Sequence, residues 1–451
     1  MRKILSFILC LSITCSVFIF PSNAQDSYTY GDVDADGKIT AADALLILQV
    51  VVGKLYLDRE GYYAADVTGD VCLYGYFDHT AEDALLVLKY VVGKITRFPA
   101  QDLDPNEPPV PPDFTPDGEL VAGQEVDFIL EIPQGRDIKI LQLNDLQPTY
   151  LESGEVTRHG YRGPFGATMT QSVWPYVTEA INAANPDLIV LGGDNVEGAF
   201  DDTGAEWEEL CTIMDSYQIP WMIVFGNHDR ESITGTTWQK AMLEQSEYCL
   251  FASADCTGDS NYTVAVKQGD QYKYILWALD TNGTNPSLLQ GNPQADLICT
   301  ESGLQADQIN WIKNTAYGIE YDLGKQIPSL LFMHIPPACI NNAIDKYYPD
   351  YIELPFTPTE DGDFGIATEL PGGGGSKDLD KIATNMGCKG MFFGHQHQVA
   401  LSIDYQGIRY TWGLKSSTGS YIDRNLIGST LITINEQTNA FTIDYLFSDL
   451  I

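Results

Sequence analysis

Basic residues are scarce in this sequence. Its 451 residues include 25 lysines and arginines against 62 aspartates and glutamates, which gives a net charge of −37 at pH 7. A surface this acidic repels nucleic acid and anionic membranes, so neither is expected as a scaffold for the chain. The same charge favours the recruitment of cations but does not select a fold.

Long apolar runs are also scarce, and the one that approaches a membrane-spanning length lies at the start. Ile4–Phe20 follows Arg2 and Lys3 and is followed by small residues that end at Ala24. A basic start, an apolar middle and a small-residue exit are typical of a secretory signal peptide. We expect residues 1–24 to be removed and the protein to be secreted, with no membrane contact afterwards; a membrane anchor is the alternative.

Cysteine is too sparse to frame a small disulfide-stabilised fold. Of nine cysteines, Cys10 and Cys15 lie in the leader, and the other seven are scattered. Cys249 and Cys256 are close enough in sequence to pair, and the others stay unassigned. The chain length predicts more than one domain.

An internal repeat is the clearest feature that the sequence does contain. TAADALLILQVVVGKL (residues 40–55) returns as TAEDALLVLKYVVGKI (residues 80–95), with 11 of 16 positions identical. Apolar residues recur at helical spacing in both copies, so each copy predicts a helix that needs a packing partner. The other copy is the expected partner.

The loop before the first helix carries calcium ligands at a defined spacing. In DVDADGKITAAD, aspartates occupy positions 1, 3, 5 and 12, and Gly37 occupies the sharp turn at position 6. Calcium takes six to eight oxygen ligands, which such a loop wraps around one point. The predicted ligands are Asp32, Asp34, Asp36, the Lys38 carbonyl, Thr40 and Asp43.

The second loop is altered by an insertion. Asp66, Thr68 and Asp70 begin it and Asp83 closes it, 17 positions after its first aspartate where the first loop needs 11. No glycine occupies the turn position if the insertion is VCLYGY. We still expect these four residues to bind calcium.

A secreted pair of loop–helix units with no helix before the first loop resembles a type I dockerin, over roughly residues 28–97. The resemblance implies calcium-dependent folding and docking to a cohesin module of a scaffoldin, and hence an extracellular, cellulosome-associated location. In that family the residues before each closing aspartate help to choose the partner; here they are Ala41 and Ala42, then Ala81 and Glu82. The alternative is a generic calcium-buffer module. The expected export from the cell counts against it.

A proline- and acid-rich segment, FPAQDLDPNEPPVPPDFTPDGE, follows this region and predicts a stiff, extended spacer. The expected organisation is a signal peptide (1–24), a small all-α calcium-binding dockerin with two loops (25–99), a linker (100–122) and one large α/β domain (123–451).

In the large domain, five short apolar runs end in residues that bind metals. The runs are DIKILQLND, ending at Asp145; DLIVLGGDN, ending at Asp194 and Asn195; PWMIVFGNHD, ending at Asn227, His228 and Asp229; SLLFMHIPP, containing His334; and GMFFGHQH, ending at His395 and His397. They are typical of buried strands, and the helix-like stretches between several of them favour βαβ crossovers. Loops converge at the carboxyl ends of such strands.

These ligand types point to a reaction. Four of the six histidines lie at these strand ends. Asp, Asn and His together suit borderline ions such as Mn, Fe or Zn, and a carboxylate between two histidine-bearing regions can bridge two of them. Two ions about 3.5–4 Å apart activate a shared water for phosphoryl displacement.

The ordered set GGDN, GNHD, an isolated strand-end histidine and GHQH resembles the calcineurin-like metallophosphoesterases, closest to the purple-acid-phosphatase-like branch. The resemblance covers roughly residues 137–448. It implies a sandwich of two mixed β-sheets flanked by helices, and two divalent or trivalent metal ions that activate a hydroxide to hydrolyse phosphate esters.

Carried over by motif, the resemblance assigns a role to each residue. Asp194 is expected to bridge both ions. The expected ligands of one ion are Asn227, His334 and His395, and those of the other are Asp145 and His397. His228 is expected to protonate the leaving oxygen outside the metal shell, with Asp229 either orienting it or simply solvated. Arg230 is predicted to contact the substrate anion.

Two positions depart from the family pattern. Gln147 stands where the family has a metal-binding histidine, and Glu197 stands three residues beyond Asp194, where true purple acid phosphatases place their metal-binding tyrosine. Either Gln147 or a water completes the first site and the protein is a phosphatase, or the domain is a weakly active or inactive metal-binding module docked for a binding role. The intact His228 favours the enzyme.

Overall fold

The computed structural model describes residues 29–51, 54, 64–65, 67–68, 81–99, 126–164, 166–347, 364–376 and 378–450. The chain divides into two compact units, of which the first contains the described residues up to 99 and the second those from 126 onward. The predicted signal peptide, the linker at 100–122 and the calcium ligands Asp66 and Asp70 lie outside the described residues.

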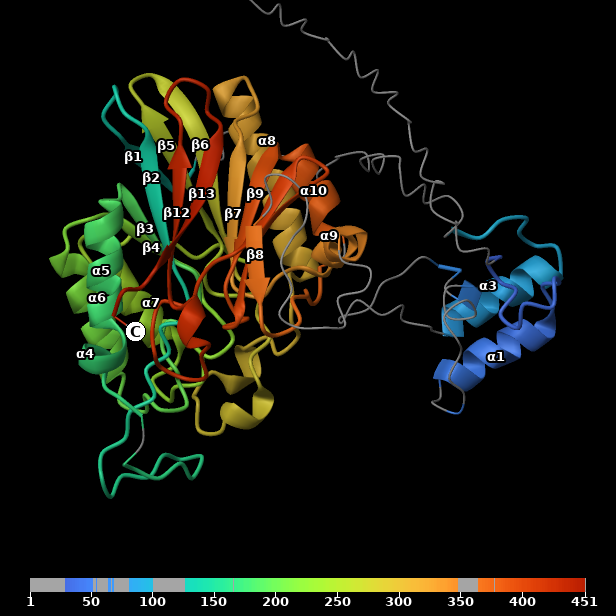
Figure 1. Ribbon diagram of the computed structural model, residues 1–451, viewed down its shortest axis with the longest axis horizontal. Coiled ribbons are helices and arrows are strands. Elements are labelled where there is room, and N and C mark those ends of the chain that lie inside the picture. The colour runs from blue at the N-terminus through green and yellow to red at the C-terminus, as the bar shows by residue number, and fades with distance from the viewer. Residues whose placement is uncertain are drawn as a thin grey trace, which may run out of the picture. The chain divides into compact units, whose positions relative to one another are not determined.

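In the first unit, the two copies of the repeat form the predicted helices. They are α1 (Ala41–Val51) and α3 (Ala81–Val91), shown in blue in Figure 1. Ile47 and Val87, at equivalent positions of the repeat, are fully buried in one small core together with Phe98. The two helices therefore bury matching faces against each other, as the duplicated pattern predicts.

The first predicted calcium loop folds around its carboxylates. Asp32 accepts hydrogen bonds from the N–H groups of Asp36 and Gly37, both at 3.0 Å. Asp43 is 1% exposed and accepts from Val33 N–H at 2.8 Å and Thr40 N–H at 2.7 Å. Gly37 has φ +85°, the left-handed turn for which glycine was expected at position 6.

The closing residue of the second loop is placed in the same way. Asp83 is fully buried, and its Oδ1 accepts from the N–H groups of Val67 and Thr68 at 3.1 and 3.0 Å and from Thr68 Oγ1 at 2.8 Å. In both loops the last aspartate thus ties the helix start to the loop entry.

The second unit contains two mixed β-sheets. The larger has the order β1-β5-β6-β7-β9-β11-β10-β8, and the smaller β13-β12-β2-β3-β4. The strands of the larger sheet are β1 (Phe128–Glu131), β5 (Tyr262–Gln268), β6 (Gln271–Leu279), β7 (Ser329–Met333), β8 (Phe364–Ala367), β9 (Cys388–Phe393), β10 (Val399–Tyr405) and β11 (Ile408–Trp412). Those of the smaller sheet are β2 (Ile138–Leu143), β3 (Leu188–Leu191), β4 (Trp221–Ile223), β12 (Gly428–Ile434) and β13 (Phe441–Phe447).

All five predicted ligand-bearing strands are confirmed. Three of them, β2, β3 and β4, are parallel neighbours in the smaller sheet, and β7 and β9 are parallel neighbours in the larger one. The helices between them are α5 (Trp174–Ala184) and α6 (Ala205–Ser216), which form the predicted crossovers from β2 to β3 and from β3 to β4. The carboxyl ends of these strands therefore carry the metal-binding motifs.

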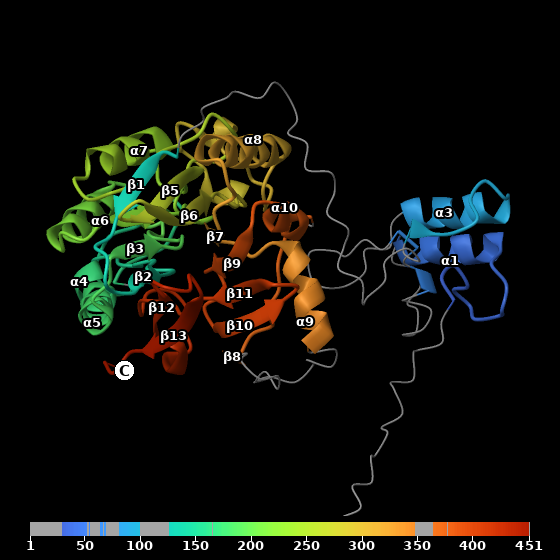
Figure 2. The ribbon, with the colours of Figure 1, turned by 90° about the horizontal axis from the view of Figure 1, so that it is seen from above.

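The main core is shared by both sheets. One apolar cluster joins Ile140 and Val190 of the smaller sheet to Leu276, Phe332 and Phe392 of the larger. In Figures 1 and 2, the smaller sheet has α4 (Met169–Ser172), α5 and α6 beside it, and the larger sheet has α8 (Ala306–Leu323), α9 (Asn341–Tyr347) and α10 (Leu379–Asn385) beside it. A further helix, α7 (Thr236–Gln245), contacts α6. This is the sandwich of two mixed sheets that the sequence predicted.

Within the part of the chain that the structure describes, every helix is too short or too polar to span a bilayer.

The structure also bears on the expected cysteine pairing. Cys249 and Cys256 both carry free thiols. The pairing that their sequence proximity allows is therefore not made.

Replacing Asp43 with asparagine tests the closing contact of the first loop. Because an amide nitrogen cannot accept the N–H groups that converge on this buried carboxylate, Asp43→Asn is expected to lower the free energy of unfolding of the first unit by about 1.5–3 kcal/mol. Hydrogen exchange of the α1 amides, measured by mass spectrometry in calcium, reports this loss. The exposed Asp270 supplies the control Asp270→Asn; unchanged protection of α1 in the Asp43 variant would contradict the expectation.

Candidate metal centre

The strand-end residues of both sheets converge on one buried point. Asp194, His334 and His395 each place a ligand atom within 4.8 Å of the others, and so do Asp145, Asp194 and His397. His334 Nε2 lies 3.1 Å from Asp194 Oδ2, and His397 Nε2 lies 3.3 Å from Asp145 Oδ1. Two triads that share Asp194 are the arrangement that a two-ion site needs.

Unusual backbone conformations bring these side chains together. Asp145, Asp194 and His395 have φ values of +52°, +50° and +71°, which non-glycine residues rarely adopt. A side chain at Gly226 would place its Cβ 2.2 Å from the Asp194 carboxylate, and one at Gly193 would come within 2.4 Å of the His334 ring. Glycine in the GGDN and GNHD motifs therefore permits the close approach of loop and ligand.

Backbone carbonyls orient two of the histidines. His334 Nδ1 lies 3.1 Å from the Gly192 carbonyl oxygen, and His397 Nδ1 lies 2.9 Å from that of Tyr421. Each Nδ1 donates to the carbonyl, which turns the Nε2 lone pair toward the carboxylates. This is the second coordination sphere that metal-binding histidines require.

The donor set fits a metal ion. Asn227 Oδ1 is buried and has no hydrogen-bond partner among the residues that the structure describes, although such atoms are normally paired. Burial, followed by the nearby His334, lowers the pKa of His395 to about 4 and keeps that imidazole neutral. A neutral imidazole and an unpaired amide oxygen are both suitable ligands for a transition-metal ion.

His228 lies at the partly exposed edge of the centre. Its backbone N–H donates to Asp194 Oδ1 at 2.9 Å. Its ring Nδ1 lies 2.9 Å from Glu231 Oε1 and 3.1 Å from Glu197 Oε1. Burial opposes protonation, but the carboxylates of Asp194, Glu197 and Glu231 raise the pKa of His228 overall. The sequence interpretation missed Glu231, although an acid three residues beyond the histidine is a local signal.

Asp229 has a different role from the one predicted. It is fully buried, and its carboxylate accepts from Asn195 N–H at 2.8 Å, Val196 N–H at 3.0 Å and Gly226 N–H at 2.6 Å. Neither predicted alternative fits, because the carboxylate is not solvated and its contacts join the loop after β3 to the loop after β4 instead of reaching the His228 ring. Asp229 instead fixes the two loops that carry Asp194 and Asn227.

Arg230 is buried and paired, in contrast to its predicted contact with substrate. Its side chain is 2% exposed, and its guanidinium group pairs with Asp259 at 2.9 Å and with Asp280, and donates to the Gly226 carbonyl at 3.2 Å. A buried group held on three sides does not meet a substrate from solvent. The predicted substrate contact is therefore wrong, and Arg230 anchors the GNHD loop.

Gln147 lies in the centre but does not present its oxygen to it. Its Nε2 donates to Asp194 Oδ2 at 2.8 Å, and its Oε1 lies 3.4 Å from Lys415 Nζ. Lys415 also donates to the Asp145 carbonyl, and burial lowers its pKa to about 8. No local sequence signal identifies Lys415, which is 268 residues from Gln147 along the chain.

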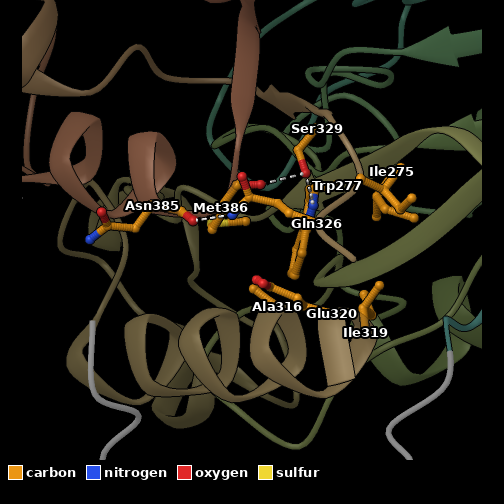
Figure 3. A pocket seen from close by; sticks show the side chains of 10 residues that line it. Ile275, Trp277, Ala316, Ile319, Glu320, Gln326, Ser329, Asn385 and Met386 are labelled. Carbon is orange, nitrogen blue, oxygen red and sulfur yellow. Dashed lines mark hydrogen bonds between the residues drawn. The ribbon is translucent and has the colours of Figure 1, made fainter. Parts of the chain in front are cut away.

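A separate cavity between α8 and the larger sheet contains none of these residues. It has a volume of about 20 Å³, and Trp277, Glu320 and Met386 contribute to its lining (Figure 3). A space of that size holds about one water molecule.

The chain is similar to one family of known proteins and to one of its curated members. Residues 138–399 match the family described as calcineurin-like phosphoesterase, a range that contains the whole cluster from Asp145 to His397. A curated Arabidopsis thaliana protein named probable inactive purple acid phosphatase 28 is 24% identical over 260 residues, 53% of this chain and 60% of that protein. The chain thus spans less than two thirds of the length of this relative.

Two solved structures are also similar. Purple acid phosphatase PPD1 from yellow lupin (Lupinus luteus) seeds is 11% identical with a TM-score of 0.34, over 69% of this chain and 54% of that chain. A chain of a cohesin–dockerin complex from Acetivibrio cellulolyticus is 40% identical with a TM-score of 0.15, over 17% of this chain and 99% of that chain.

Replacing Asp229 with asparagine tests whether this carboxylate anchors the two ligand loops. Asp229→Asn is expected to lower the free energy of unfolding by about 1–3 kcal/mol, because an amide cannot accept every N–H that the carboxylate accepts. Bound metal is expected to fall with it, since the ligand loops lose their common anchor. Thermal unfolding and metal analysis measure both effects; a lower turnover rate with unchanged stability and metal content would instead restore Asp229 as the partner of His228.

Proposed function

The chain belongs to the calcineurin-like phosphoesterase family, and from this premise we propose that it is a metal-dependent hydrolase of phosphate esters. One observation supports the proposal above all: two carboxylate–histidine triads share Asp194 beside a histidine held by two glutamates. Such a centre combines cation binding with proton transfer, which are the two requirements of phosphoester hydrolysis.

The proposed ligands are the two triads that share Asp194, together with Asn227, which the GNHD motif assigns. One ion is assigned to Asp194, Asn227, His334 and His395, and the other to Asp145, Asp194 and His397. Two ions of manganese, iron or zinc, when bound, supply Lewis acidity toward water and the phosphoryl group. The chain itself fixes the ligand atoms on rigid strand ends and keeps them out of bulk water.

His228 is the proposed general acid. Its side chain is 29% exposed, so it can reach an ester that enters from solvent. Glu231 and Glu197 hold its Nδ1 and leave Nε2 free to give a proton to the leaving oxygen. The resulting product is an alcohol and a phosphate species, with the substrate class open.

A module with little or no turnover is the second candidate. It is favoured by the amide of Gln147, which faces Asp194 with its nitrogen, and by the name of the Arabidopsis relative as probably inactive. Against it stands the complete arrangement around His228. A protein that only binds metal does not require a partly exposed histidine, such as His228, that is held by two carboxylates.

Hydrolysis of an aryl phosphate with added manganese separates the two candidates. His228→Asn is expected to lower the turnover rate by about 10²–10⁴-fold while bound metal stays unchanged, because the proton donor is lost and no proposed ligand is touched. His395→Ala is expected to lose both metal and activity. Wild-type turnover no greater than that of His395→Ala would reject the enzyme in favour of the second candidate.

We further propose that the first unit is a calcium-binding dockerin that attaches a secreted enzyme to a cohesin. Its support is the repeat itself: Leu45 and Leu85 are 55% and 49% exposed, and Leu48 and Leu88, then Val51 and Val91, repeat the pattern along the two helices. Leucines exposed at equivalent places in both copies form apolar faces suited to a protein partner. The acidic loops are the proposed calcium sites.

Binding of the full chain to a type I cohesin tests the docking proposal. The double substitution Leu45→Asp with Leu85→Asp is expected to weaken binding about 100-fold or more, because it places charge on both apolar faces. Removal of calcium by a chelator is expected to abolish binding. Phe447→Asp, a matched change at an exposed apolar residue of the other unit, serves as the control; equal affinity of the double variant and this control would contradict the proposal.

A further inference from the structure

A buried lysine adjoins the metal centre. Lys415 is 1% exposed, and its backbone forms isolated bridges with Asn144 and Ile427, which fix it between β2 and β12. Its Nζ donates to the carbonyl oxygen of Asp145, which also accepts from Ser417 Oγ at 3.1 Å. The buried ammonium group is therefore hydrogen-bonded to the backbone of Asp145, one of the proposed metal ligands.

The amide of Gln147 links this charge to the shared carboxylate. Its oxygen faces Lys415 Nζ at 3.4 Å, and its nitrogen donates to Asp194 Oδ2 at 2.8 Å. Gln147 is 1% exposed, its φ is +30°, and a Cβ at Gly419 would come within 2.2 Å of its carbonyl oxygen. The amide is thus confined, with its nitrogen toward Asp194.

This chain of contacts makes the two proposed subsites unequal. At the subsite of Asp145, Asp194 and His397, the buried ammonium group of Lys415 contacts the backbone of Asp145, which supplies one of the ligands. A like charge in a buried environment opposes the entry of a cation. The other subsite adjoins His228, but that ring faces the carboxylates of Glu197 and Glu231, which compensate a positive charge there.

We propose that Lys415, acting through Gln147 and the Asp145 carbonyl, is a positioning residue that makes the centre load in two steps. The subsite of Asp194, Asn227, His334 and His395 fills first and holds its ion tightly. The subsite of Asp145 and His397 fills second, binds its ion weakly and exchanges it readily. The inference rests on the proposed two-ion centre.

Titration of the metal-free full-length protein with Mn²⁺ tests the order. Calorimetry is expected to resolve two binding steps in the large unit with dissociation constants at least about tenfold apart. Electron paramagnetic resonance is expected to show an isolated-ion signal after the first step and an exchange-coupled pair after the second. Both readouts are independent of hydrolysis.

Substitutions of Lys415 identify the cause. Lys415→Met removes the charge and is expected to tighten the second step about tenfold or more without changing the first. Lys415→Gln keeps an N–H donor for the Asp145 carbonyl without charge, and it gives the same answer if the methionine variant fails to fold. Lys415→Arg retains the charge and is expected to retain the two-step pattern.

Lys273 offers a matched control. It is 5% exposed, and its Nζ donates to the Glu436 carbonyl at 2.7 Å and to the Gln271 side-chain oxygen at 3.3 Å, the same pair of acceptor types. Lys273→Met is expected to lower stability and leave both Mn²⁺ steps unchanged. A shift of the second step by this variant would make the effect of Lys415 a general loss of packing and overturn the inference.

The remaining outcomes distinguish this inference from the proposed function. Two equal Mn²⁺ sites in the wild type, or a second step that neither neutral variant tightens, overturn the role of Lys415 while hydrolysis continues. Failure of the large unit to bind Mn²⁺, together with absence of hydrolysis, overturns the two-ion centre and the inference together.

Discussion

The large unit depends on one buried carboxylate that several groups share. Asp194 faces His334 Nε2 and accepts hydrogen bonds from the Gln147 amide and the His228 N–H. Burial alone raises the pKa of a carboxyl group, but His334 and His228 lower that of Asp194 well below its usual range. A buried carboxylate that stays ionised is costly unless its charge is compensated. The surrounding hydrogen-bond donors and the proposed cations compensate the charge of Asp194.

The two-sheet architecture brings these groups together. Three ligand-bearing strands belong to the smaller sheet and two to the larger, so neither sheet contains the complete centre. The common apolar core holds the sheets face to face, while the strained φ values of Asp145, Asp194 and His395 aim the loop ends inward. Packing far from the site thus offsets the local cost of those conformations.

The first unit also contains buried carboxylates whose charge is compensated by hydrogen bonds. Asp43 and Asp83 are buried carboxylates, and each accepts hydrogen bonds from N–H groups of its own loop. Removing either acceptor leaves several buried donors unpaired, which is the costly half of a lost hydrogen bond. In both units, therefore, aspartates link local turns into defined shapes as well as presenting oxygen to cations.

The sequence by itself determined the repeated helices and the five strands that end in metal-binding residues, because apolar periodicity, glycine at turns and ligand types at strand ends are encoded within short segments. The two-sheet sandwich and the ligand roles were expected from the resemblance of the ordered motifs to a known family. Only the tertiary structure decided that Asp229 and Arg230 anchor loops, that Glu231 holds His228, and that Lys415 lies against Gln147. Such roles depend on which distant segments meet and on which donors are already used, and a linear pattern does not contain that information.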